Sequence, residues 1–342
     1  MEVEKGGRNY LNQTGVAISS LGHSMNHPAL SPHSQNPPAA WLSSAALAGF
    51  AAAGTNAHRL DTTPGGWVER LGSDVLISHK DDDARDTALE GLAAWSARHG
   101  FAAARVFGKH LPRQNEDRAA PVLLAGDAAA PLVTVVEENG MRFGLDFAAG
   151  YSAGLFIDQR ANRALVRRNG GRRLLNTFAY TCSFSVAAAL AGAETVSIDL
   201  SKKSLDRGRE NFALNGLPTA GETRHRFYAD DVLEVLPRLA RKGETFDTII
   251  LDPPTFSRGH KGRKFQAEHD LEALLLTALD LAAPRAKILL STNCTRLTRR
   301  ALETLARFAL KGVRRTADFH SESPLPDIPA DAGAQTLWMF LR

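Results

Sequence analysis

The sequence contains very little cysteine: Cys182 and Cys294 are the two thiols in 342 residues. This scarcity excludes a disulfide framework and a zinc site built from thiolates, and it favours a reducing, cytoplasmic location. The 11 histidines fall in no H-E-x-x-H or comparable spacing, so we expect no metal site. Long apolar runs are missing too, because residues 39–53 fall short of the roughly 18 residues that a membrane span needs. We therefore expect no membrane association.

After Glu2 and Glu4, acidic residues are missing from a long segment of the chain. None occurs between Lys5 and Leu60, where serine, asparagine, histidine and proline are frequent. We predict that residues 1–52 form a poorly ordered or partly helical extension. An organellar transit peptide is also poor in acidic residues, but it is rich in arginine, which this segment is not.

The remaining composition is ordinary. Apolar residues make up 44% and charged residues 23% of the chain, as in typical globular proteins, so extensive disorder is not expected. The 41 basic and 37 acidic residues leave a net charge of +4, which permits binding to a polyanion without requiring it. The length suits two domains of ordinary size.

Residues 53–150 are predicted to form a small α+β domain that could bind the substrate or RNA. Asp81-Asp82-Asp83 can cap a helix that ends at Gly100. Glu138-Asn139-Gly140 predicts a hairpin turn, because asparagine and glycine tolerate positive φ. The strands expected in this part are 67–71, 74–79, 105–107, 132–136 and 141–147.

Residues 151–342 alternate between strand and helix patterns. Such alternation predicts an α/β fold, with a parallel sheet covered by helices on both faces. The expected strands are 173–177, 194–199, 224–229, 246–252 and 287–292. The expected helices are 183–191, 202–215, 231–241, 267–283 and 298–310. Two final strands, 313–319 and 335–341, have no helix between them and predict an antiparallel hairpin at the sheet's edge.

In such a sheet the ligand lies beyond the carboxyl ends of the strands. The first turn there, residues 176–184, lacks the G-x-G-x-x-G glycines that bring a backbone close to a pyrophosphate. This absence disfavours NAD, FAD and ATP but leaves room for a nucleoside without phosphates. Asp199 follows Thr177 by 22 residues, a spacing at which an acid binds ribose hydroxyls. Asp230 and Asp231 could accept a hydrogen bond from an adenine amino group, and for all three acids a helix cap is the alternative.

The fourth strand runs into Asp252-Pro253-Pro254. The two prolines fix φ and remove two donors, so the carboxylate of Asp252 is expected to sit on a rigid turn. A rigid acceptor suits an amino or ring N–H group of a substrate. An ordinary turn after an apolar strand is the alternative.

A basic segment follows that turn. It contains Arg258, Lys261, Arg263 and Lys264 among glycines. A phosphate backbone would order such a loop beside a cleft, whereas a solvated flexible loop is the alternative. Further basic pairs occur in the second half of the chain, with no aromatic-interleaved basic stripe.

Cys294 closes the fifth strand at the same edge. Its thiolate could add to C6 of a pyrimidine and activate C5 for methylation. The alternative is a small buried apolar residue, and this packing role is also expected for Cys182.

These motifs together resemble a known family. Residues 154–163 (GLFIDQRANR), 176–184 (NTFAYTCSF), Asp199 and 252–256 (DPPTF) are similar to the S-adenosylmethionine-dependent methyltransferases related to bacterial 23S ribosomal RNA methyltransferases that act on cytosine C5 or guanine. The resemblance runs from about residue 55 to 342. It implies a seven-stranded, Rossmann-like class I methyltransferase sheet over 151–342, preceded by a smaller N-terminal α+β domain.

The resemblance also implies roles for single residues and a cofactor, S-adenosylmethionine. Asp199 would hold its ribose, and Asp230 or Asp231 would face its adenine. The residues that would line its methionine end are Asp158, Gln159, Arg160, Phe178 and Tyr180.

Two features depart from the family pattern. The first 50 residues are too interrupted by proline to form the RNA-binding PUA domain that some relatives carry. Relatives acting on cytosine C5 use a cysteine where Cys294 stands, whereas the segment 252–257 (DPPTFS) resembles relatives acting on guanine.

The predicted function is S-adenosylmethionine-dependent methylation of a base in ribosomal RNA, with Asp252 positioning the base. The partner is therefore RNA, and a homodimer is left open. The alternatives are the same catalytic fold acting on a protein or small molecule, and a catalytically silent RNA-binding scaffold.

Overall fold

The computed structural model of the chain describes residues 41–113, 116–219, 224–259, 264–330 and 332–342. Residues 39–342 form one compact unit. Of the predicted N-terminal extension, residues 1–40 lie outside the described residues, and its last part forms helix α1 (Ser44–Ala52). Ser43 begins this helix because its hydroxyl accepts a hydrogen bond from the backbone N–H of Ala46.

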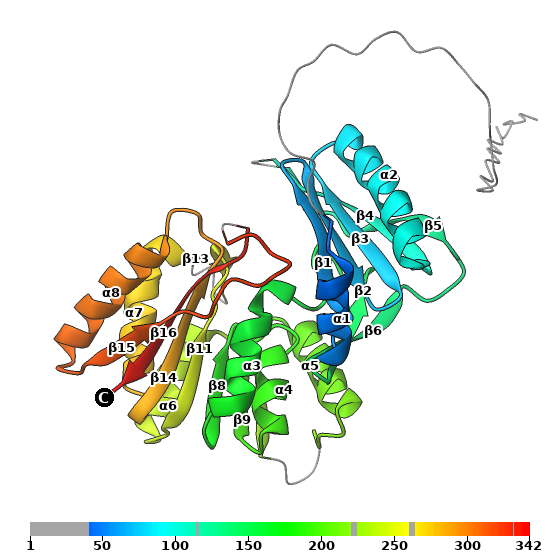
Figure 1. The fold of residues 1–342 in the computed structure, drawn as a ribbon. Coiled ribbons are helices and arrows are strands. Elements are labelled where there is room, and N and C mark those ends of the chain that lie inside the picture. Colours follow the sequence, from blue (N-terminus) through cyan, green and yellow to red (C-terminus); the bar gives the residue numbers. More distant parts are fainter. Residues whose placement is uncertain (1–40, 114–115, 220–223, 260–263, 331) are drawn as a thin grey trace, which may run out of the picture. The chain divides into compact units, whose positions relative to one another are not determined.

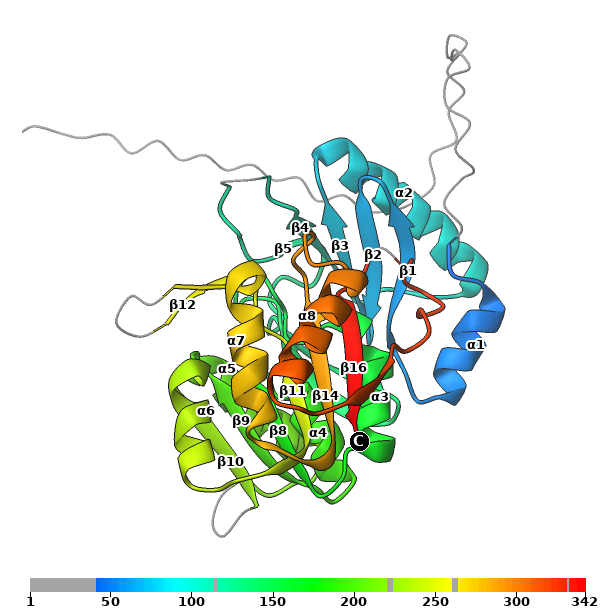
Figure 2. The same ribbon diagram turned by 90° about the vertical axis from the view of Figure 1, so that its left-hand side faces the viewer.

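The first sheet has the strand order β1-β2-β3-β4-β5, in which β3 and β4 are parallel and the other pairs antiparallel. Helix α2 (Asp82–His99) lies across one face (Figures 1 and 2). Its predicted ends are confirmed: Asp81 caps the start, and Gly100 closes it at φ 63°. The strands are β1 (Ala57–Thr63), β2 (Gly66–Leu71), β3 (Asp74–His79), β4 (Arg105–His110) and β5 (Val122–Gly126).

A hairpin of β6 (Val133–Glu138) and β7 (Met141–Asp146) follows. The predicted turn is confirmed, because Asn139 and Gly140 both have positive φ, 50° and 70°. The hairpin's apolar side chains belong to the same core as residues of the second sheet. Helix α5 (Lys202–Leu214) contacts β7 and joins the two parts.

The second sheet has seven strands in the order β10-β9-β8-β11-β14-β16-β15. The first five are parallel, and β16 is antiparallel to both of its neighbours, so the predicted antiparallel edge hairpin is confirmed. The strands are β8 (Arg173–Thr177), β9 (Glu194–Asp199), β10 (His225–Ala229), β11 (Phe246–Leu251), β14 (Ala282–Thr292), β15 (Ala317–His320) and β16 (Gln335–Leu341).

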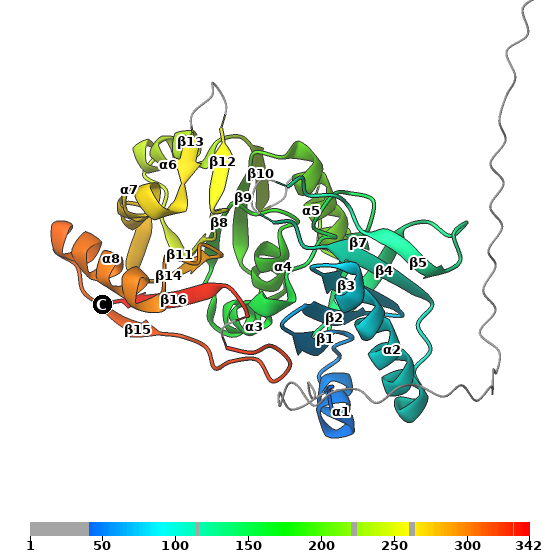
Figure 3. The ribbon, with the colours of Figure 1, turned by 90° about the horizontal axis from the view of Figure 1, so that it is seen from above.

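Helices cover both faces of this sheet (Figure 3). Ile249 and Ile288 pack toward α6 (Val232–Arg241), α7 (Ala267–Leu279) and α8 (Arg299–Gly312). Their neighbours Ile250 and Leu289 pack into the other layer, which holds α3 (Arg160–Asn169), α4 (Ser183–Leu190) and α5. Alternate side chains are therefore buried on opposite faces, which explains the continuous apolar runs. The predicted fold class is confirmed.

The sequence prediction misplaced several boundaries and missed several elements. The strand expected over 313–319 begins at Ala317, and the strand expected over 105–107 continues to His110. The helix expected over 267–283 ends at Leu279, and the strand expected from residue 287 begins at Ala282, which pairs with Phe246. The elements that were not predicted include β1, β5, α3 and the short pair β12 (Phe256–Arg258) and β13 (Lys264–Gln266).

Candidate active site

The carboxyl ends of the five parallel strands meet at one edge of the second sheet, the upper edge in Figure 1. The predicted residue Asp199 ends β9 there, and the predicted residues Asp230, Asp252 and Cys294 follow β10, β11 and β14. The fold therefore brings together side chains that are far apart in the sequence.

The turn after β8 is strained. Phe178, Tyr180 and Cys182 adopt positive φ angles of 52°, 48° and 60°, although none is glycine. Each such residue costs on the order of 1–2 kcal/mol, and conformations of this kind persist where the surroundings enforce them. Here the Tyr180 hydroxyl donates to the carbonyl of Ser152 at 2.7 Å, and its backbone N–H donates to Asp199 at 2.8 Å.

Hydrogen bonds between buried side chains hold the residues next to this turn in place. The amide of Asn176 donates to the hydroxyl of Ser185 at 2.9 Å, and Ser185 lies 2.8 Å from the hydroxyl of Ser197. Thr177 donates to the carbonyl of Ile250 on the next strand at 2.7 Å. Side-chain hydrogen bonds thus fix a turn that nucleotide-binding folds usually fix with glycines.

Asp199 is anchored by the backbone. One carboxylate oxygen accepts from Tyr180 and the other accepts from the N–H of Ser201 at 2.8 Å. Burial raises the pKa of this carboxyl, and the two backbone hydrogen bonds lower it. The helix-cap alternative does not hold here, because Ser201 caps α5 with its own hydroxyl.

Asp230 and Asp231 have different neighbours. Asp231 caps α6 by accepting from the N–H of Leu233 at 2.9 Å, so the cap alternative describes this contact. Asp230 accepts from the N–H of Asp231 at 2.8 Å and forms an ion pair with Arg238. The backbone N–H of Asp230 donates to the carbonyl of Asp199, which places the two strand ends side by side.

A pocket opens beside these acids. Its walls include Phe178, Leu200, Val232 and Phe265, with the carboxyl-bearing Asp231 at its margin. Apolar side chains beside a carboxylate suit a flat aromatic ring that carries an amino group. The lining therefore has the chemistry expected of a site for such a ring, and Asp199 ends the strand next to the one that leads to Asp231.

Asp252 follows β11 on the predicted turn, with Pro253 buried and Pro254 exposed. Burial, with a smaller contribution from the charge of the nearby Asp158, raises the pKa of the Asp252 carboxyl to about 6. A hydrogen bond from Ser291 and the charge of Arg163 act in the opposite direction.

A chain of buried side chains leads to Asp252. The indole N–H of Trp338 donates to Asn162 at 2.8 Å, and the amide of Asn162 donates to Gln159 at 2.8 Å. Gln159 then donates to the hydroxyl of Ser291 at 2.9 Å. Because an indole can only donate, it sets the direction of every bond in the chain, and the Ser291 hydroxyl is left to donate to Asp252.

This series of hydrogen bonds changes how the predicted residue Gln159 can be interpreted. Both heteroatoms of its amide are bonded inside the protein, and its side chain is buried. Sequence reasoning did not single out Asn162, Ser291 or Trp338. They are spread over more than half of the chain, and no local spacing connects them.

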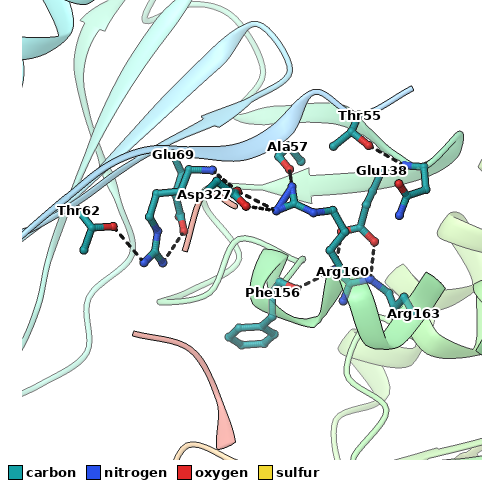
Figure 4. Close-up of polar contacts among 11 residues, drawn as sticks. Thr55, Ala57, Thr62, Glu69, Glu138, Phe156, Arg160, Arg163 and Asp327 are labelled. Atoms are coloured by element: carbon teal, nitrogen blue, oxygen red, sulfur yellow. Dashed lines mark hydrogen bonds and ion pairs between the residues drawn. The ribbon is translucent and has the colours of Figure 1, made fainter. Parts of the chain in front are cut away.

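Two buried ion pairs lie on the side of the N-terminal sheet (Figure 4). Arg160 binds both carboxylate oxygens of Asp327 at 2.6 and 2.7 Å and donates to the carbonyl of Ala57. Arg163 binds Glu138 at 2.7 and 2.5 Å and donates to the carbonyl of Phe156. The predicted residue Arg160 is thus bonded to the loop before β16 and to β1.

Asp158 interacts with the loop before β16 and with Asp252. Its carboxylate accepts from the N–H of Ala334 at 3.0 Å, and its charge acts on Asp252. It also lines a second pocket with Asn162, Arg299 and Ser321. Phe156, just before it, is an exposed aromatic whose ring lies 5.6 Å from that of Tyr180.

The predicted basic segment flanks the same edge. Arg258 on β12 pairs with Lys264 on β13 in an antiparallel register, and both are exposed. Lys261 and Arg263 lie outside the described residues. Arg258 stands 6.0 Å from the ring centre of the exposed Phe256.

The other basic residues divide between the two edges of the sheet. Arg296 and Arg299 follow the carboxyl end of β14 and lie at the edge with the acids. Arg173 begins β8 at the opposite edge and pairs with Glu244 at 2.8 Å. Arg315 donates to backbone carbonyls at that opposite edge.

Both cysteines are buried. Cys294 is 5% exposed and packs in the apolar cluster that contains Leu297 and Leu302. Burial raises the pKa of Cys182 to about 12, with a hydrogen bond to Ser197 acting against it. These surroundings match the packing alternative for each thiol.

Among the described helices, none combines the length and the hydropathy needed to cross a bilayer. Within the described ranges, no three histidine, cysteine, aspartate or glutamate side chains gather in a way that could hold a metal ion.

The model of the S-adenosylmethionine-dependent methyltransferase family matches residues 80–339. Ribosomal RNA large subunit methyltransferase I of Shewanella denitrificans is 32% identical over 246 residues, which are 69% of this chain and 59% of that protein. Ribosomal RNA large subunit methyltransferase K/L of a Psychrobacter species is 41% identical over 165 residues, 47% of this chain and 20% of that protein. The chain spans between about a fifth and three fifths of these relatives.

Solved structures have the same fold. SMU.776, provisionally described as a methyltransferase and solved in complex with SAH, has a TM-score of 0.74 and 26% identity, over 86% of this chain and 78% of that one. An S-adenosylmethionine-dependent methyltransferase from Agrobacterium tumefaciens has a TM-score of 0.65 and 21% identity, over 84% and 90% of the two chains.

Proposed function

The chain belongs to the S-adenosylmethionine-dependent methyltransferase family, and we propose that it transfers the methyl group of that cofactor to a base of large-subunit ribosomal RNA. The observation that carries the proposal is the pairing of two features at one sheet edge. A mostly apolar pocket that Asp231 also lines is one of them, and the other is Asp252, an acid on a proline turn whose hydrogen-bond donor is the Ser291 hydroxyl and not a guanidinium.

The residues at this edge fit the cofactor. Asp199 would hold the ribose hydroxyls, and the pocket of Phe178, Leu200 and Asp231 would hold the adenine. S-adenosylmethionine supplies a methyl group on a cationic sulfur and contains no phosphate, so the missing glycine pattern is expected. The protein's own contribution is to place the accepting atom in line with the methyl group, at about 3–3.5 Å.

Asp252 would position the base. Its carboxylate accepts a hydrogen bond from an amino or ring N–H group and can take up a proton as the methylated base loses one, because its pKa is raised to about 6. Ser291 and Gln159 are positioning residues in this scheme, since the chain from Trp338 fixes the hydroxyl that holds Asp252.

The names of the relatives support RNA as the substrate class, because methyltransferases I and K/L are both named as ribosomal RNA large subunit methyltransferases. Arg258, Lys264 and Arg296 stand at the edge where a phosphate backbone would approach the site. Lys261 and Arg263 extend the same basic segment in the sequence. A cytoplasmic location and a homodimer belong to this proposal and are tested by cell fractionation and by light scattering.

Mass spectrometry of nucleosides tests the proposal directly. Large-subunit ribosomal RNA from cells with and without the gene should differ by one methylated nucleoside, and purified protein with labelled S-adenosylmethionine should restore it. Loss of a methyl group from a protein or small molecule instead would favour the second substrate class. Calorimetry that detects no S-adenosylmethionine binding would favour the silent scaffold.

A further inference from the structure

The face of the N-terminal sheet opposite α2 carries polar residues aligned across three strands. Trp67 on β2 pairs directly with Ser78 on β3, and Ser78 pairs with Lys109 on β4. Directly paired residues project from the same face of a sheet. Their neighbours Val68 and Ile77 project from the other face and join the core under α2.

Cations and aromatic rings alternate along this face. The Arg59 guanidinium lies 4.9 Å from the Trp67 ring centre, and Lys109 Nζ lies 5.6 Å from the same centre. Lys109 Nζ is also 5.1 Å from the Tyr151 ring centre, and the Arg118 guanidinium is 5.4 Å from it. We call these five residues the cation–ring column. They come from distant parts of the sequence, so no local stripe could reveal them.

Several polar atoms in and beside the column lack a partner among the described residues. They are Nε of Arg59, Nε1 of Trp67 and Oγ of Ser78. Ser78 is 1% exposed and Arg59 is 5% exposed, so water does not readily satisfy them. A buried donor left unpaired costs about 1–3 kcal/mol, so stability alone does not explain the polar residues of this face.

The column also carries positive charge in excess. Its cations are Arg59, Lys109 and Arg118, and the ion pair described for them is that of Arg59 with Glu69 at 3.3 Å. Burial lowers the pKa of Lys109, with Glu69 acting against this and Arg59 adding to it. An anion bound at Lys109 would oppose that lowering, because it stabilises the charged ammonium.

We propose that the cation–ring column binds a nucleotide of the RNA substrate other than the one that is methylated. Phosphate oxygens would accept from Lys109, and the base would pack on Tyr151. The exposed guanidinium of Arg118, a planar cation over the Tyr151 ring, occupies the position that a base would take.

The column is connected to the methyl-transfer site through the backbone. Tyr151 is followed by Ser152, whose carbonyl accepts from Tyr180 in the strained turn after β8. Asp327 links the two places as well, because it accepts from the backbone N–H of Arg59 and from Arg160. This inference rests on RNA being the substrate and adds a second contact with it.

The test measures binding of a fluorescein-labelled 12-nucleotide oligouridine to the full chain by anisotropy, at several salt concentrations. Lys109→Gln should weaken binding at least about fivefold and reduce the slope of log K against log salt by about 0.7, the value for one phosphate contact on a single strand. Tyr151→Leu should weaken binding at least about fivefold without changing the slope, and Tyr151→Phe should restore it.

Arg307→Gln is the matched control. Arg307 also stands over an aromatic ring, 4.5 Å from the centre of Phe319, but it lies on α8 and pairs with Glu303. It should leave affinity and slope unchanged. Calorimetry with S-adenosylmethionine should give the same affinity for every variant, which shows that each is folded.

Two results overturn the inference in distinguishable ways. If the wild-type chain binds the oligonucleotide and methylates ribosomal RNA while Lys109→Gln and Tyr151→Leu behave like it, the column is no RNA contact and the proposed function stands. If the wild-type chain binds S-adenosylmethionine but no RNA, both fail. A glutamate 12-mer that binds as tightly as the oligonucleotide and ignores Tyr151→Leu would show a site for charge alone, which also contradicts the proposal.

Discussion

The acids Glu138, Asp327 and Asp252 are held in two different ways. Glu138 and Asp327, on the side of the N-terminal sheet, are each bound by two hydrogen bonds from one arginine of α3. Asp252, at the carboxyl edge of the second sheet, is held by the hydroxyl of Ser291 at the end of a chain of neutral groups. Glu138 and Asp327 are buried and Asp252 is half-buried, and the partner of the carboxylate differs between the two cases.

The difference separates architecture from chemistry. A guanidinium compensates the charge of a buried acid permanently, which suits an acid that joins two parts of the structure. A neutral donor orients an acid without fixing its charge, so burial can raise its pKa into the range where protons are exchanged. The acid proposed to act on the substrate is therefore the one without its own arginine.

The largest expected effect comes from breaking a guanidinium pair. Arg163→Ala leaves the carboxylate of Glu138 buried and uncompensated, which should lower the free energy of unfolding by about 3–5 kcal/mol. Urea denaturation followed by circular dichroism measures this loss. Replacing both partners, Glu138→Leu with Arg163→Met, should recover most of it, because the uncompensated charge disappears.

An exposed pair serves as the control for that experiment. Arg85 pairs with Asp82 at 2.8 Å on the first turn of α2, where Asp82 is 78% exposed. Arg85→Ala should leave the denaturation midpoint unchanged, because solvent screens such pairs. Equal losses for Arg85→Ala and Arg163→Ala would remove the distinction between buried and exposed arginines on which the comparison depends.

The second effect concerns Asp252 and appears in the rate. Asp252→Asn should slow methyl transfer by about 100-fold or more, because the amide no longer offers a carboxylate to the base. Binding of S-adenosylmethionine, measured by calorimetry, should be unchanged. Retained turnover would show that Asp252 is only an ordinary turn residue.

The same variant should respond to pH in a defined direction. The native carboxyl has a pKa raised to about 6, so the folded state binds its proton more tightly than the unfolded state does. Wild-type stability therefore decreases relative to Asp252→Asn as pH rises from about 4 to 6, and the deficit persists above 6. Denaturation at pH 3.5 and at pH 8 measures it, and a variant that is less stable than the wild type only at pH 8 would contradict the sign.

The sequence predicts the region around Asp252 well and the region of the arginine pairs poorly. Strands β8 and β9 were predicted at their observed ends, because parallel strands buried on both faces are continuous apolar runs. Helix α3 was missed, because its buried side chains include Arg160, Asn162 and Arg163, which reverses the usual apolar periodicity. Strand β1 was missed for the same reason, since it buries His58, Arg59 and Asp61.

The site shows the same limit. Asp199, Asp252 and the turn after β8 could be located from strand ends, since each follows its strand directly. The contacts of Gln159 and Arg160 could not, because their partners Ser291 and Asp327 are more than 130 positions away in the sequence. Pairing between distant residues is set by the topology of the sheet, which no local spacing records.

A smaller effect is expected when the chain of neutral groups is cut. Ser291→Ala should slow methyl transfer about tenfold, the value of one hydrogen bond to a charged group. It should also move the acidic limb of the pH–rate profile to higher pH. In the wild type the hydrogen bond from Ser291 lowers the pKa of Asp252, so removing that bond raises the pKa. Gln159→Leu should do the same and leave cofactor affinity unchanged, whereas weaker cofactor binding would return Gln159 to the methionine end.

Thr248→Ala is the control for Ser291→Ala. Thr248 is a buried hydroxyl on β11, the strand that precedes Asp252, and it donates to the carbonyl of Gly170 at the opposite edge. Its replacement should cost about 1 kcal/mol of stability and leave the pH–rate profile in place. A shift of the profile in Thr248→Ala would mean that any lost hydroxyl in this sheet alters Asp252.

The smallest effect on rate and stability is expected at Cys294. This residue extends the comparison to a buried side chain that packs in an apolar cluster. Its 5% exposure among leucines indicates that Cys294→Ala removes packing and little else, so stability should fall by about 1 kcal/mol and the rate should stay near that of the wild type. Denaturation and a methylation assay on ribosomal RNA measure both. A variant that binds S-adenosylmethionine normally and transfers no methyl group would instead assign covalent attack on a cytosine to this thiol. The sulfur of Cys294, more than the carboxylate of Asp252, would then select the base.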